Sequence, residues 1–586
     1  MSRNSLLLVL TCIAGLLFTN VSAQPFLRLE TGLHYAKISK VASDASGKYL
    51  LTASYDKTAR MWDAATGQLL KTFRVQIGED NNGKLYSCSL SPDGQIAAVG
   101  GWDEKNTIYL IHTQTGNIIH TITDLPEVIF DLDFSKDGRY LAAGLGNEYG
   151  VRIYDTQSWS ERAKLDEYKS SGAAVTFDSQ GRLAVVGGEG QIRLYSASFT
   201  FTKEIPSPGN LQPEKVAFNP SGTLLAIAYT NGSKVEACDG YSLEKLYSPS
   251  VKRDNTDDGN LSSIAFSADG QSLYAGGSYA AVDSENKWKF AVRRWSSAGK
   301  GGYQDLLFFN NTIINFAPLP NGNLAVAGAN PDLAVISGNN TIWHHISNEN
   351  DYAITDVSHF KVNATGMALG FNSNNYEPQS FDLLTRTLVT ETSYFPGPTS
   401  KNGGLEITDL KKTNGPLMNG KKASFVRSRE QVFSADISST GREAVFGTGW
   451  NLYKTDAAGT KVWSTALPET GWAVNISSND KTVVVAMGDG TIRWYSMADG
   501  KELLAFYLRN DNKRWILFTP TGYYDAAPGA ENFLGWHINN GFEKVPEFFP
   551  VSRFREQYYR PDVIDAILTT YNIDEAIKLA NSRSQK

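Results

Sequence analysis

Cysteine is scarce in this chain of 586 residues, which contains three. Cys12 lies in an apolar leading segment, so Cys88 and Cys238 are the two that remain for the folded part. Two cysteines make neither a disulfide framework nor a structural zinc site. Both lie in strand-like segments, and we expect buried free thiols, with a single disulfide as the alternative in an oxidising compartment.

Basic charge is also lacking. The chain has 55 Lys and Arg against 61 Asp and Glu, a net charge of −6, and a pI near 5.8. A protein that binds the phosphate backbone of a nucleic acid needs a basic stripe, and an anionic membrane surface attracts runs of Lys and Arg. The sequence has neither feature, so we expect no nucleic acid and no anionic membrane surface among its partners.

Long apolar runs are missing beyond the N-terminus. Leu6–Phe18 is too short to span a bilayer comfortably, follows one positive charge in MSRNS and leads into the small residues of VSA. We expect residues 1–23 to be a secretory signal peptide cleaved after Ala23, which would export the protein to the periplasm or the extracellular space without a transmembrane segment. An uncleaved anchor is the alternative. Lipidation of Cys12 is not expected, because the apolar run continues beyond it.

The sequence signatures of nucleotide, dinucleotide and haem binding are absent. GGSYA at residues 276–280 lacks the last Gly of a nucleophile elbow. His537 is the tempting general base, with Asp525 and Glu531 nearby in sequence, but no nucleophile is tied to it. A His in an alternating strand is more often packed and hydrogen-bonded. We therefore predict no catalytic residue and no cofactor.

Two segments invite a metal-site interpretation. DNTDDGN at residues 254–260 resembles a calcium loop, but Ala265 stands where an EF-hand requires Glu. His344 and His345 are adjacent, so in a strand they point to opposite faces. We therefore predict an exposed acidic loop, two separate histidines and no metal site.

Glycine, by contrast, is abundant, with 52 residues. Ten of these glycines end the turn of a repeating unit, which consists of an alternating apolar strand, the turn and a second strand. From Gly47 to Gly366, successive turn glycines lie 41 to 52 residues apart, close to the four-strand period of a propeller blade. Helical periodicity is absent before about residue 550. The turn glycines are Gly47, Gly94, Gly138, Gly181, Gly222, Gly270, Gly322, Gly366, Gly441 and Gly522, with a related turn at Asp480.

The repeats resemble the WD-repeat β-propeller family over about residues 30–540. The residues that carry this resemblance are Trp62-Asp63 in ARMWDAATG, Tyr154-Asp155 in VRIYDTQS and Trp494-Tyr495 in TIRWYSMADG, together with the SPDG-type turns. The Gly-His pair that often opens a repeat is missing, so the resemblance does not carry over the hydrogen-bond network built on that His. We expect Asp56 and Asp489 to be acceptors for backbone groups in turns.

The period and the resemblance predict an all-β fold of two tandem β-propellers, with about twelve WD-like blades and a short α-helical tail, because one ring usually has four to eight blades. We expect a first, seven-bladed propeller at residues 30–350, a second, irregular one at 351–541 and a helical tail at 542–586. An equal division of six and six blades is the alternative.

Residues 514–563 are aromatic and distinctive. Together with IDEAIKLAN at residues 573–581, the pieces RWILFTPTGYYDAAPG, FLGWHINNG and EFFPVSRFREQYYRPDV resemble the segment that links WD-repeat regions to caspase-like peptidase domains in bacterial proteins. Too few residues follow for a peptidase domain, and neither Cys88 nor Cys238 lies in a caspase-type signature. The resemblance implies a separately encoded caspase-like peptidase as a partner. The family-motif residues, structural or interacting, are Trp515, Gly522, Tyr523, Tyr524, Asp525, Gly535, Trp536, His537, Asn539, Arg560, Pro561 and Asp562.

The last segment is helical in pattern. Pro561 suits a first helical turn, and Asn572 with Glu575 three residues later suits an N-cap. An apolar stripe either packs on the side of the propeller or docks a partner. The stripe consists of Ile564, Ile567, Leu568, Ile573, Ile577 and Ala580.

Three functions remain open at this stage. An exported, non-enzymatic scaffold, which binds protein through its rims or C-terminal helices, is the leading hypothesis. The second is a periplasmic propeller hydrolase or lyase with a site in the central channel. The third is an envelope sensor that binds a glycan or small ligand through exposed aromatic residues, for which the candidates are Trp288, Trp295, Trp343 and Trp450.

Overall fold

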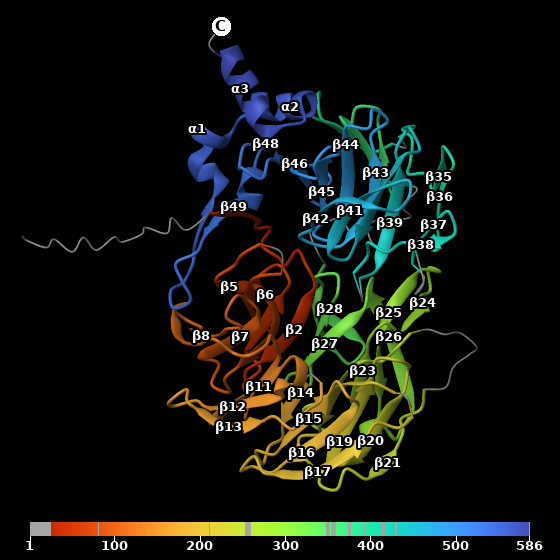
Figure 1. Ribbon diagram of the computed structural model, residues 1–586. Helices are drawn as coiled ribbons and strands as arrows, with labels where there is room; N and C mark the ends of the chain where they lie inside the picture. The colour runs from red at the N-terminus through yellow and green to blue at the C-terminus, as the bar shows by residue number, and fades with distance from the viewer. Residues whose placement is uncertain are drawn as a thin grey trace, which may run out of the picture.

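The computed structural model describes residues 25–584 apart from 80, 171, 210, 252–258, 347–351, 353–358, 373–376, 392, 412–415 and 428–429. Strands dominate it, and in the described part α-helices occur only near the C-terminus (Figure 1). The predicted signal peptide and most of the predicted acidic loop at 254–260 lie outside the described residues.

Seven antiparallel sheets between residues 38 and 345 form a ring, the lower part of Figure 1. The first strand of each sheet contacts the first strand of the next, and β2 of the first sheet contacts β27 and β28 of the seventh, which closes the ring. These first strands, β2, β6, β10, β14, β18, β22 and β27, are called the inner strands below. Because every sheet is covered by its neighbours, the outermost strands, such as β17, are the most exposed.

The strands of the ring follow chain order in every sheet except the sixth, where β25 pairs with β23, β24 and β26. They are β2 (Ile38–Ser43), β3 (Tyr49–Ser54), β4 (Thr58–Asp63), β5 (Leu69–Arg74); β6 (Lys84–Leu90), β7 (Ile96–Trp102), β8 (Ile108–His112), β9 (Ile118–Ile122); β10 (Ile129–Phe134), β11 (Tyr140–Leu145), β12 (Val151–Asp155), β13 (Glu161–Leu165); β14 (Gly172–Phe177), β15 (Leu183–Gly187), β16 (Gln191–Tyr195), β17 (Phe201–Pro206); β18 (Pro213–Phe218), β19 (Leu224–Tyr229), β20 (Val235–Asp239), β21 (Lys245–Tyr247); β22 (Ser263–Phe266), β23 (Leu273–Gly276), β24 (Ala280–Val282), β25 (Trp288–Trp295), β26 (Tyr303–Phe309); and β27 (Ile313–Pro318), β28 (Leu324–Gly328), β29 (Leu333–Ser337), β30 (Asn340–His345).

Four further sheets, the second group, lie between residues 361 and 526. Three have four strands, and the last has six. Both β31 and β39 contact β43. The strands are β31 (Lys361–Val362), β32 (Ala368–Asn372), β33 (Pro378–Asp382), β34 (Thr387–Val389); β35 (Lys401–Asn402), β36 (Leu405–Thr408), β37 (Leu417–Met418), β38 (Lys421–Lys422); β39 (Val432–Ile437), β40 (Glu443–Thr448), β41 (Asn451–Asp456), β42 (Lys461–Ala466); and β43 (Gly471–Ile476), β44 (Thr482–Met487), β45 (Thr491–Ser496), β46 (Glu502–Leu508), β47 (Trp515–Phe518), β48 (Tyr524–Ala526). The predicted fold class, all-β with blade-like sheets and a short helical end, is confirmed.

A twelfth sheet joins the two ends of the chain. β1 (Phe26–Leu29) pairs antiparallel with β49 (Leu534–Ile538), so that Phe26 stands opposite His537. β49 also pairs with β50 (Glu547–Pro550). β50 is therefore a strand inside the stretch predicted to be a helical tail, since its backbone completes the free edge of β49. The domain boundaries at residues 350 and 541 remain predictions, and this sheet spans the second of them.

The C-terminal helices are α1 (Arg555–Tyr558), α2 (Pro561–Thr570) and α3 (Ile573–Ser584). Pro561 starts α2 as predicted, and the Glu575 amide donates to Asn572 Oδ1 at 3.1 Å, which confirms the predicted cap. Ile564, Ile567 and Leu568 are buried in the same core as the six-stranded sheet. The packing interpretation of the apolar stripe thus holds for these residues.

The first sheet of the ring contains a hydrogen-bond network that we did not expect. His34 Nδ1 lies 2.7 Å from Asp56 Oδ2, and His34 Nε2 lies 2.7 Å from Thr52 Oγ1. The indole of Trp62 donates to the same Thr52 oxygen at 2.9 Å. The sequence has no adjacent Gly-His pair here, because Leu33 stands between Gly32 and His34. His34 nevertheless forms the hydrogen bonds of the network, so the absence of the pair did not predict the absence of the network. Asp56 accepts from the Thr58 amide, as predicted, and also holds this His.

The two cysteines are confirmed as free and buried. Burial raises the pKa of the Cys88 thiol to about 12 and that of Cys238 to about 11. Both are therefore protonated, unreactive groups of the sheet cores at neutral pH. GGSYA joins the end of β23 to the start of β24, which agrees with its interpretation as a strand end.

Glu30, directly after β1, ties the twelfth sheet to the ring. Its carboxylate pairs with Arg74 and, at 3.0 Å, with Arg60, whose side chain is fully buried. Burial alone would raise the pKa of Glu30, but the two guanidinium groups hold it below its ordinary value. The Arg74 guanidinium also lies 3.8 Å from the ring centroid of Phe548 in β50. The Glu30 carboxylate thus binds two arginines of the first sheet next to the strands of the twelfth sheet.

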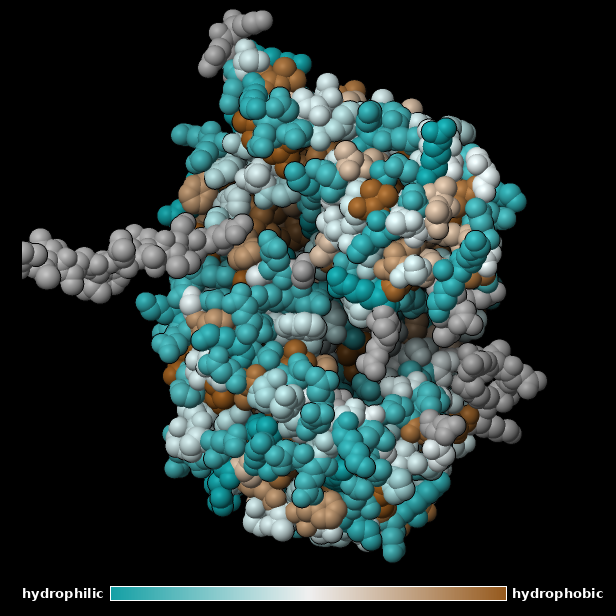
Figure 2. Space-filling model, viewed as in Figure 1, coloured by the Kyte–Doolittle hydropathy of each residue, from teal (hydrophilic) through white to brown (hydrophobic). Residues whose placement is uncertain are grey.

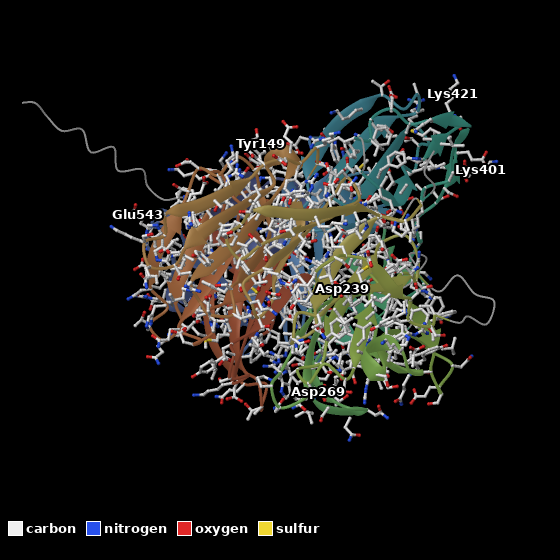
Figure 3. All side chains as sticks on the ribbon, turned by 90° about the horizontal axis from the view of Figure 1, so that it is seen from below. Tyr149, Asp239, Asp269, Lys401, Lys421 and Glu543 are labelled. Carbon is white, nitrogen blue, oxygen red and sulfur yellow. The ribbon has the colours of Figure 1, made fainter. Side chains whose placement is uncertain are left out.

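Glu30→Gln should lower the free energy of unfolding by about 3 kcal/mol, because it leaves the buried charge of Arg60 without a counter-ion. Glu543→Gln, at an exposed surface position (Figure 3), is the matched control and should change it by less than about 0.5 kcal/mol. Denaturant unfolding of the two variants measures both values. Equal stability of E30Q and E543Q would contradict the role given to Glu30.

Candidate functional site

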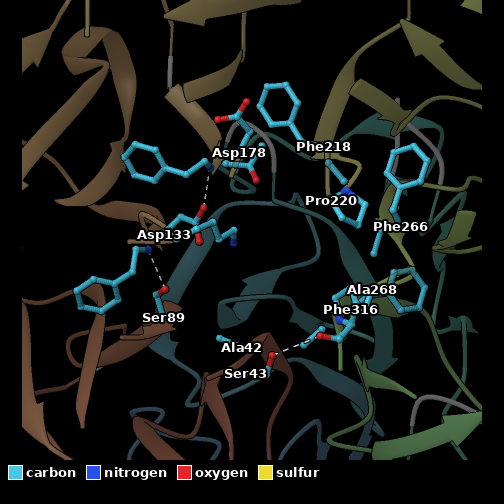
Figure 4. A pocket seen from close by; sticks show the side chains of 18 of the residues that line it. Ala42, Ser43, Ser89, Asp133, Asp178, Phe218, Pro220, Phe266, Ala268 and Phe316 are labelled. Atoms are coloured by element: carbon cyan, nitrogen blue, oxygen red, sulfur yellow. Dashed lines mark hydrogen bonds between the residues drawn. The ribbon is translucent and has the colours of Figure 1, made fainter. Parts of the chain in front are cut away.

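The centre of the ring holds a cavity of about 510 Å³. It is lined by the C-terminal halves of the seven inner strands and by the turns that follow them. In Figure 4, Ser43, Asp133, Phe218 and Phe316 surround it from four different sheets. A cavity of this size, open at one end of a ring, can take one or a few side chains of a partner or a small ligand.

An ion cluster crosses the channel. Asp131 of β10 pairs with Lys40 of β2 and lies 3.4 Å from the ammonium of Lys215 in β18. These three residues stand at the same place in their strands, three positions before the last residue. Burial alone would raise the pKa of Asp131, but Lys215 and Lys40 lower it to about 2. The carboxylate is therefore ionised and holds two cations from opposite parts of the ring.

Side chains of the channel wall also bind the backbone of the next inner strand. The amide of Val175 donates to Asp131 at 3.2 Å, and the amide of Phe177 donates to Asp133 at 2.8 Å. Ser89 accepts from the amide of Phe134 at 3.1 Å in the same way. These bonds satisfy backbone groups beside the cavity, so that the wall is rigid before any ligand arrives.

The wall of the cavity is mixed in chemistry. Phenylalanines of the strand ends and small residues such as Ala42 and Ala217 offer apolar surface, and Asp133 and Lys215 are half-buried polar groups. Neither His nor Cys is among the lining residues. In the described part of the chain, no three His, Cys, Asp or Glu side chains converge to hold a metal ion. The arrangement suits the binding of an amphipathic segment better than acid–base chemistry.

The predicted family-motif residues lie elsewhere, at the joint between the second group and the helices. Tyr524 is buried, forms a bridge with Tyr559 and accepts from the amide of Arg560 at 3.0 Å. Trp536 lies so close over Gly522 that a Cβ on that glycine would stand 2.1 Å from the indole. Tyr523 and Trp536 both pack on Tyr558. This part of the motif is therefore packed inside the joint.

Charged members of the motif form ion pairs in the same joint. Asp525 pairs with Arg386 at 2.7 Å, and Arg386 also reaches Asp565 of α2 at 2.8 Å. Arg560 binds Asp562 with two hydrogen bonds of 2.7 Å around Pro561. Trp515 packs on Phe381 of the second group, with ring centroids 5.3 Å apart.

The remaining members connect β49 to the ring. Asn539 exchanges two hydrogen bonds with the backbone of Ile77, at 3.1 and 2.7 Å. A Cβ on Gly535 would stand 2.2 Å from the ring of Phe548. His537 is buried, its Nε2 lies 3.2 Å from Asn539, and burial with the nearby Arg74 lowers its pKa to about 3. A His with this pKa is neutral at pH 7 and is a weak base.

Of the four tryptophans considered for ligand binding, two are exposed and two are packed. Trp288 is 61% exposed and Trp450 is 45% exposed, whereas Trp295 is fully buried. The indole of Trp343 donates to the backbone of Ala64 at 2.9 Å. His344 and His345 do face opposite sides: His344 packs on Phe309, whereas His345 lies 2.5 Å from the backbone oxygen of Gly67.

The channel residues were missed by the sequence reading, although a signal for them exists. Lys40, Asp131 and Lys215 each stand in the strand before a Gly-ending turn, at the same distance from that turn. A strand that is covered by sheets on both faces carries mostly apolar residues. A charged residue that recurs at the same position of several repeats is therefore unusual in such a strand. Alignment of the repeats on their turns would have identified this position.

Comparisons with known proteins support the resemblance to WD repeats. The family model "WD domain, G-beta repeat" matches residues 30–63, the stretch that holds the His34 network. Pre-mRNA-processing factor 19 of Oryza sativa subsp. japonica is 28% identical over 168 residues, 28% of this chain and 30% of that protein. WD repeat-containing protein SL1-17 of Schistosoma mansoni is 26% identical over 28% of this chain and 51% of that protein. Target of rapamycin complex subunit LST8 of Mus musculus is 23% identical over 34% and 66%. The matches thus span from about a third to two thirds of these relatives.

Asp131→Asn should lower stability at pH 7 by about 2 kcal/mol, because a carboxylate with a folded pKa near 2 and an unfolded pKa near 3.9 stabilises the fold above pH 4. This contribution is lost as pH falls from about 4 to 2, so the difference between wild type and D131N should shrink over that window. Denaturant unfolding at pH 7 and pH 3 measures it. Asp93→Asn, in an exposed turn, is the control. A difference that stays constant with pH would show that Asp131 does not act through its charge.

Proposed function

We propose that this chain is an exported, non-enzymatic interaction scaffold that takes a segment of a partner protein into the central cavity of its seven-sheet ring. The cavity is the observation that supports this proposal. It is open, is walled by inner strands whose backbone is already hydrogen-bonded, and combines apolar surface with Asp133 and Lys215. A rigid wall loses little conformational entropy on binding, which favours affinity.

A protein segment fits this cavity better than a reacting substrate. Asp131 and Lys40 are engaged with each other, so neither is free to transfer a proton. The lining residues supply hydrogen-bond donors, acceptors and phenylalanine surface, which are the groups that recognise an extended chain with one apolar side chain. The hydrolase or lyase hypothesis finds no nucleophile and base pair among these lining residues.

The relatives agree with a role in protein assemblies. The printed name of the mouse relative describes a subunit of a complex, and the Candida albicans relative is named as a subunit of eukaryotic translation initiation factor 3. Export is proposed from the signal-like residues 1–23. The finer proposal, a caspase-like peptidase as the partner, rests on the resemblance of residues 514–563 and 573–581 to a linker found beside such domains.

The joint formed by those residues also limits how a partner can be tested. A chain cut at Gly541 would lose β50 and all three helices and would uncover the core that contains Trp536 and Tyr524. Loss of a partner from such a truncated chain would not distinguish docking from unfolding. Substitutions inside the cavity are a sharper test, because they leave the joint intact.

Ala42→Trp or Ala217→Trp should fill the cavity and remove partners that the wild-type chain recovers from its native envelope fraction. Both alanines are half-buried in the channel wall. Ala457→Trp, in an exposed turn of the second group, is the matched control and should recover the wild-type set. Affinity purification with mass spectrometry compares the three variants, and thermal unfolding checks that each is folded. Recovery of the same partners by both cavity variants would contradict the proposal.

A further inference from the structure

The inner strands carry a bulge near their other end. In six of the seven inner strands of the ring the pairing register skips one residue, which is the second of the strand in five of them and the third in β6. The same skip occurs in β39 and β43 of the second group. A bulge re-aims the side chain of the extra residue, and bulges are common beside binding sites. The skipped residues are Ser39, Tyr86, Phe130, Ala173, Glu214 and Ile314 in the ring, and Phe433 and Trp472 in the second group.

Four of these bulge residues are aromatic, and they occur as two neighbouring pairs. Tyr86 and Phe130 are stacked, with centroids 6.0 Å apart and planes 10° apart. Phe433 and Trp472 meet at 4.6 Å and 63°. Phe130 is 37% exposed, and the other three are half-buried. We call these four residues the bulge platform.

The two halves of the platform lie on either side of the seam between the ring and the second group. Lys84, two residues before Tyr86, binds Glu469 across the seam at 2.9 Å. A Cβ on Gly488 would lie 3.3 Å from Trp472 Nε1 and 3.5 Å from Glu469 Cβ, so these two side chains are neighbours. Trp102 stands opposite Lys84 in the register and is 45% exposed, so it flanks the same surface. Figure 2 shows a recess between the two groups of sheets, with hydrophobic surface visible in it.

Two lysines lie beside the platform, and one of them is paired with a carboxylate. The ammonium of Lys84 binds Glu469 and lies 5.1 Å from the ring centroid of Tyr55. Lys37 lies over the same ring at 5.3 Å. Burial, with the charges of Tyr55 and Glu469, raises the pKa of Tyr86, so that its hydroxyl stays neutral and can donate or accept. Because Lys84 and Glu469 neutralise each other at the seam, the aromatic faces favour an uncharged ligand with a C–H face and several hydroxyl groups.

We propose that the bulge platform, formed by Tyr86, Phe130, Phe433 and Trp472 at the seam between the ring and the second group, binds a neutral glycan chain. The faces of pyranose rings stack on the aromatic rings, and their hydroxyl groups bind the Tyr86 hydroxyl and the Trp472 indole N–H. This site goes beyond the proposed scaffold function, because it lies at the opposite end of the inner strands from the cavity and takes a different class of ligand.

Titration of the full mature chain with cellohexaose, laminarihexaose and chitohexaose, followed by tryptophan fluorescence and calorimetry, tests this site. We expect saturable binding of at least one of these glycans. Phe130→Ala and Trp472→Ala should each weaken it by about tenfold, because each removes one stacking face. Trp288→Ala removes the more exposed tryptophan of β25 and should leave the affinity unchanged.

The proposal is overturned if none of the three glycans binds up to about 10 mM, beyond the weakest affinity expected of a shallow site. It is also overturned if F130A binds as tightly as wild type, or if W288A removes the binding. Circular dichroism reports whether each variant is folded. Should W472A not fold, F130A decides the outcome, because its side chain is already exposed at the surface.

Discussion

The structure depends on side chains that tie several inner strands to the backbone of the next. Asp131 shows this constraint most clearly, because one carboxylate accepts from Val175 in the neighbouring sheet and pairs with Lys40 and Lys215 across the channel. The second group repeats the device, since the amide of Ile476 in β43 donates to Asp436 in β39 at 2.7 Å. These bonds satisfy backbone amides where the first strands of neighbouring sheets meet. The same groups therefore hold the fold and give the channel its polar wall.

The inner strands consequently present different chemistry at their two ends. Toward the Gly-ending turns they surround a cavity with apolar walls and fixed charges. At their other end, a bulge in β10 takes Phe130 out of the pairing register, as a bulge in β43 of the second group does for Trp472. Glu30 and the pairing of β1 with β49 hold the ring against the second group, so the two surfaces keep a fixed relation to each other. Among the described helices, none is long and apolar enough to cross a membrane.

Much of the fold could be predicted from the sequence, because its units are local. Each Gly-ending turn and its flanking strands lie within one repeat, and Gly47 and Gly94 do adopt the positive φ that such turns require. The pairing of Phe26 with His537 could not be predicted in this way, because no pattern relates strands at opposite ends of a chain. The His34 network was missed for a different reason: a residue was inserted into a familiar motif, while the geometry that it serves was kept.

The candidate site was predicted less well. The distinctive residues near the C-terminus, such as Trp536 and Arg560, were correctly noticed, but the structure places them in a joint. Sequence reasoning favours rare and aromatic residues, and a seam between three packed parts of a molecule needs the same residues as a binding site. The channel charges are ordinary residues one by one. They form a cluster only after the ring closes, because closure brings Lys40 and Lys215 to the carboxylate of Asp131.

Site-specific photo-crosslinking in the native envelope tests the central claim most directly. A photoreactive residue at Ala42, in the cavity wall, is compared with one at Ala457, in an exposed turn, and the adducts are sequenced by mass spectrometry. Our account predicts one discrete protein adduct at position 42 that is absent at position 457. No adduct at position 42, or the same adducts at both positions, would contradict the assignment of the ring cavity as the site that receives a partner.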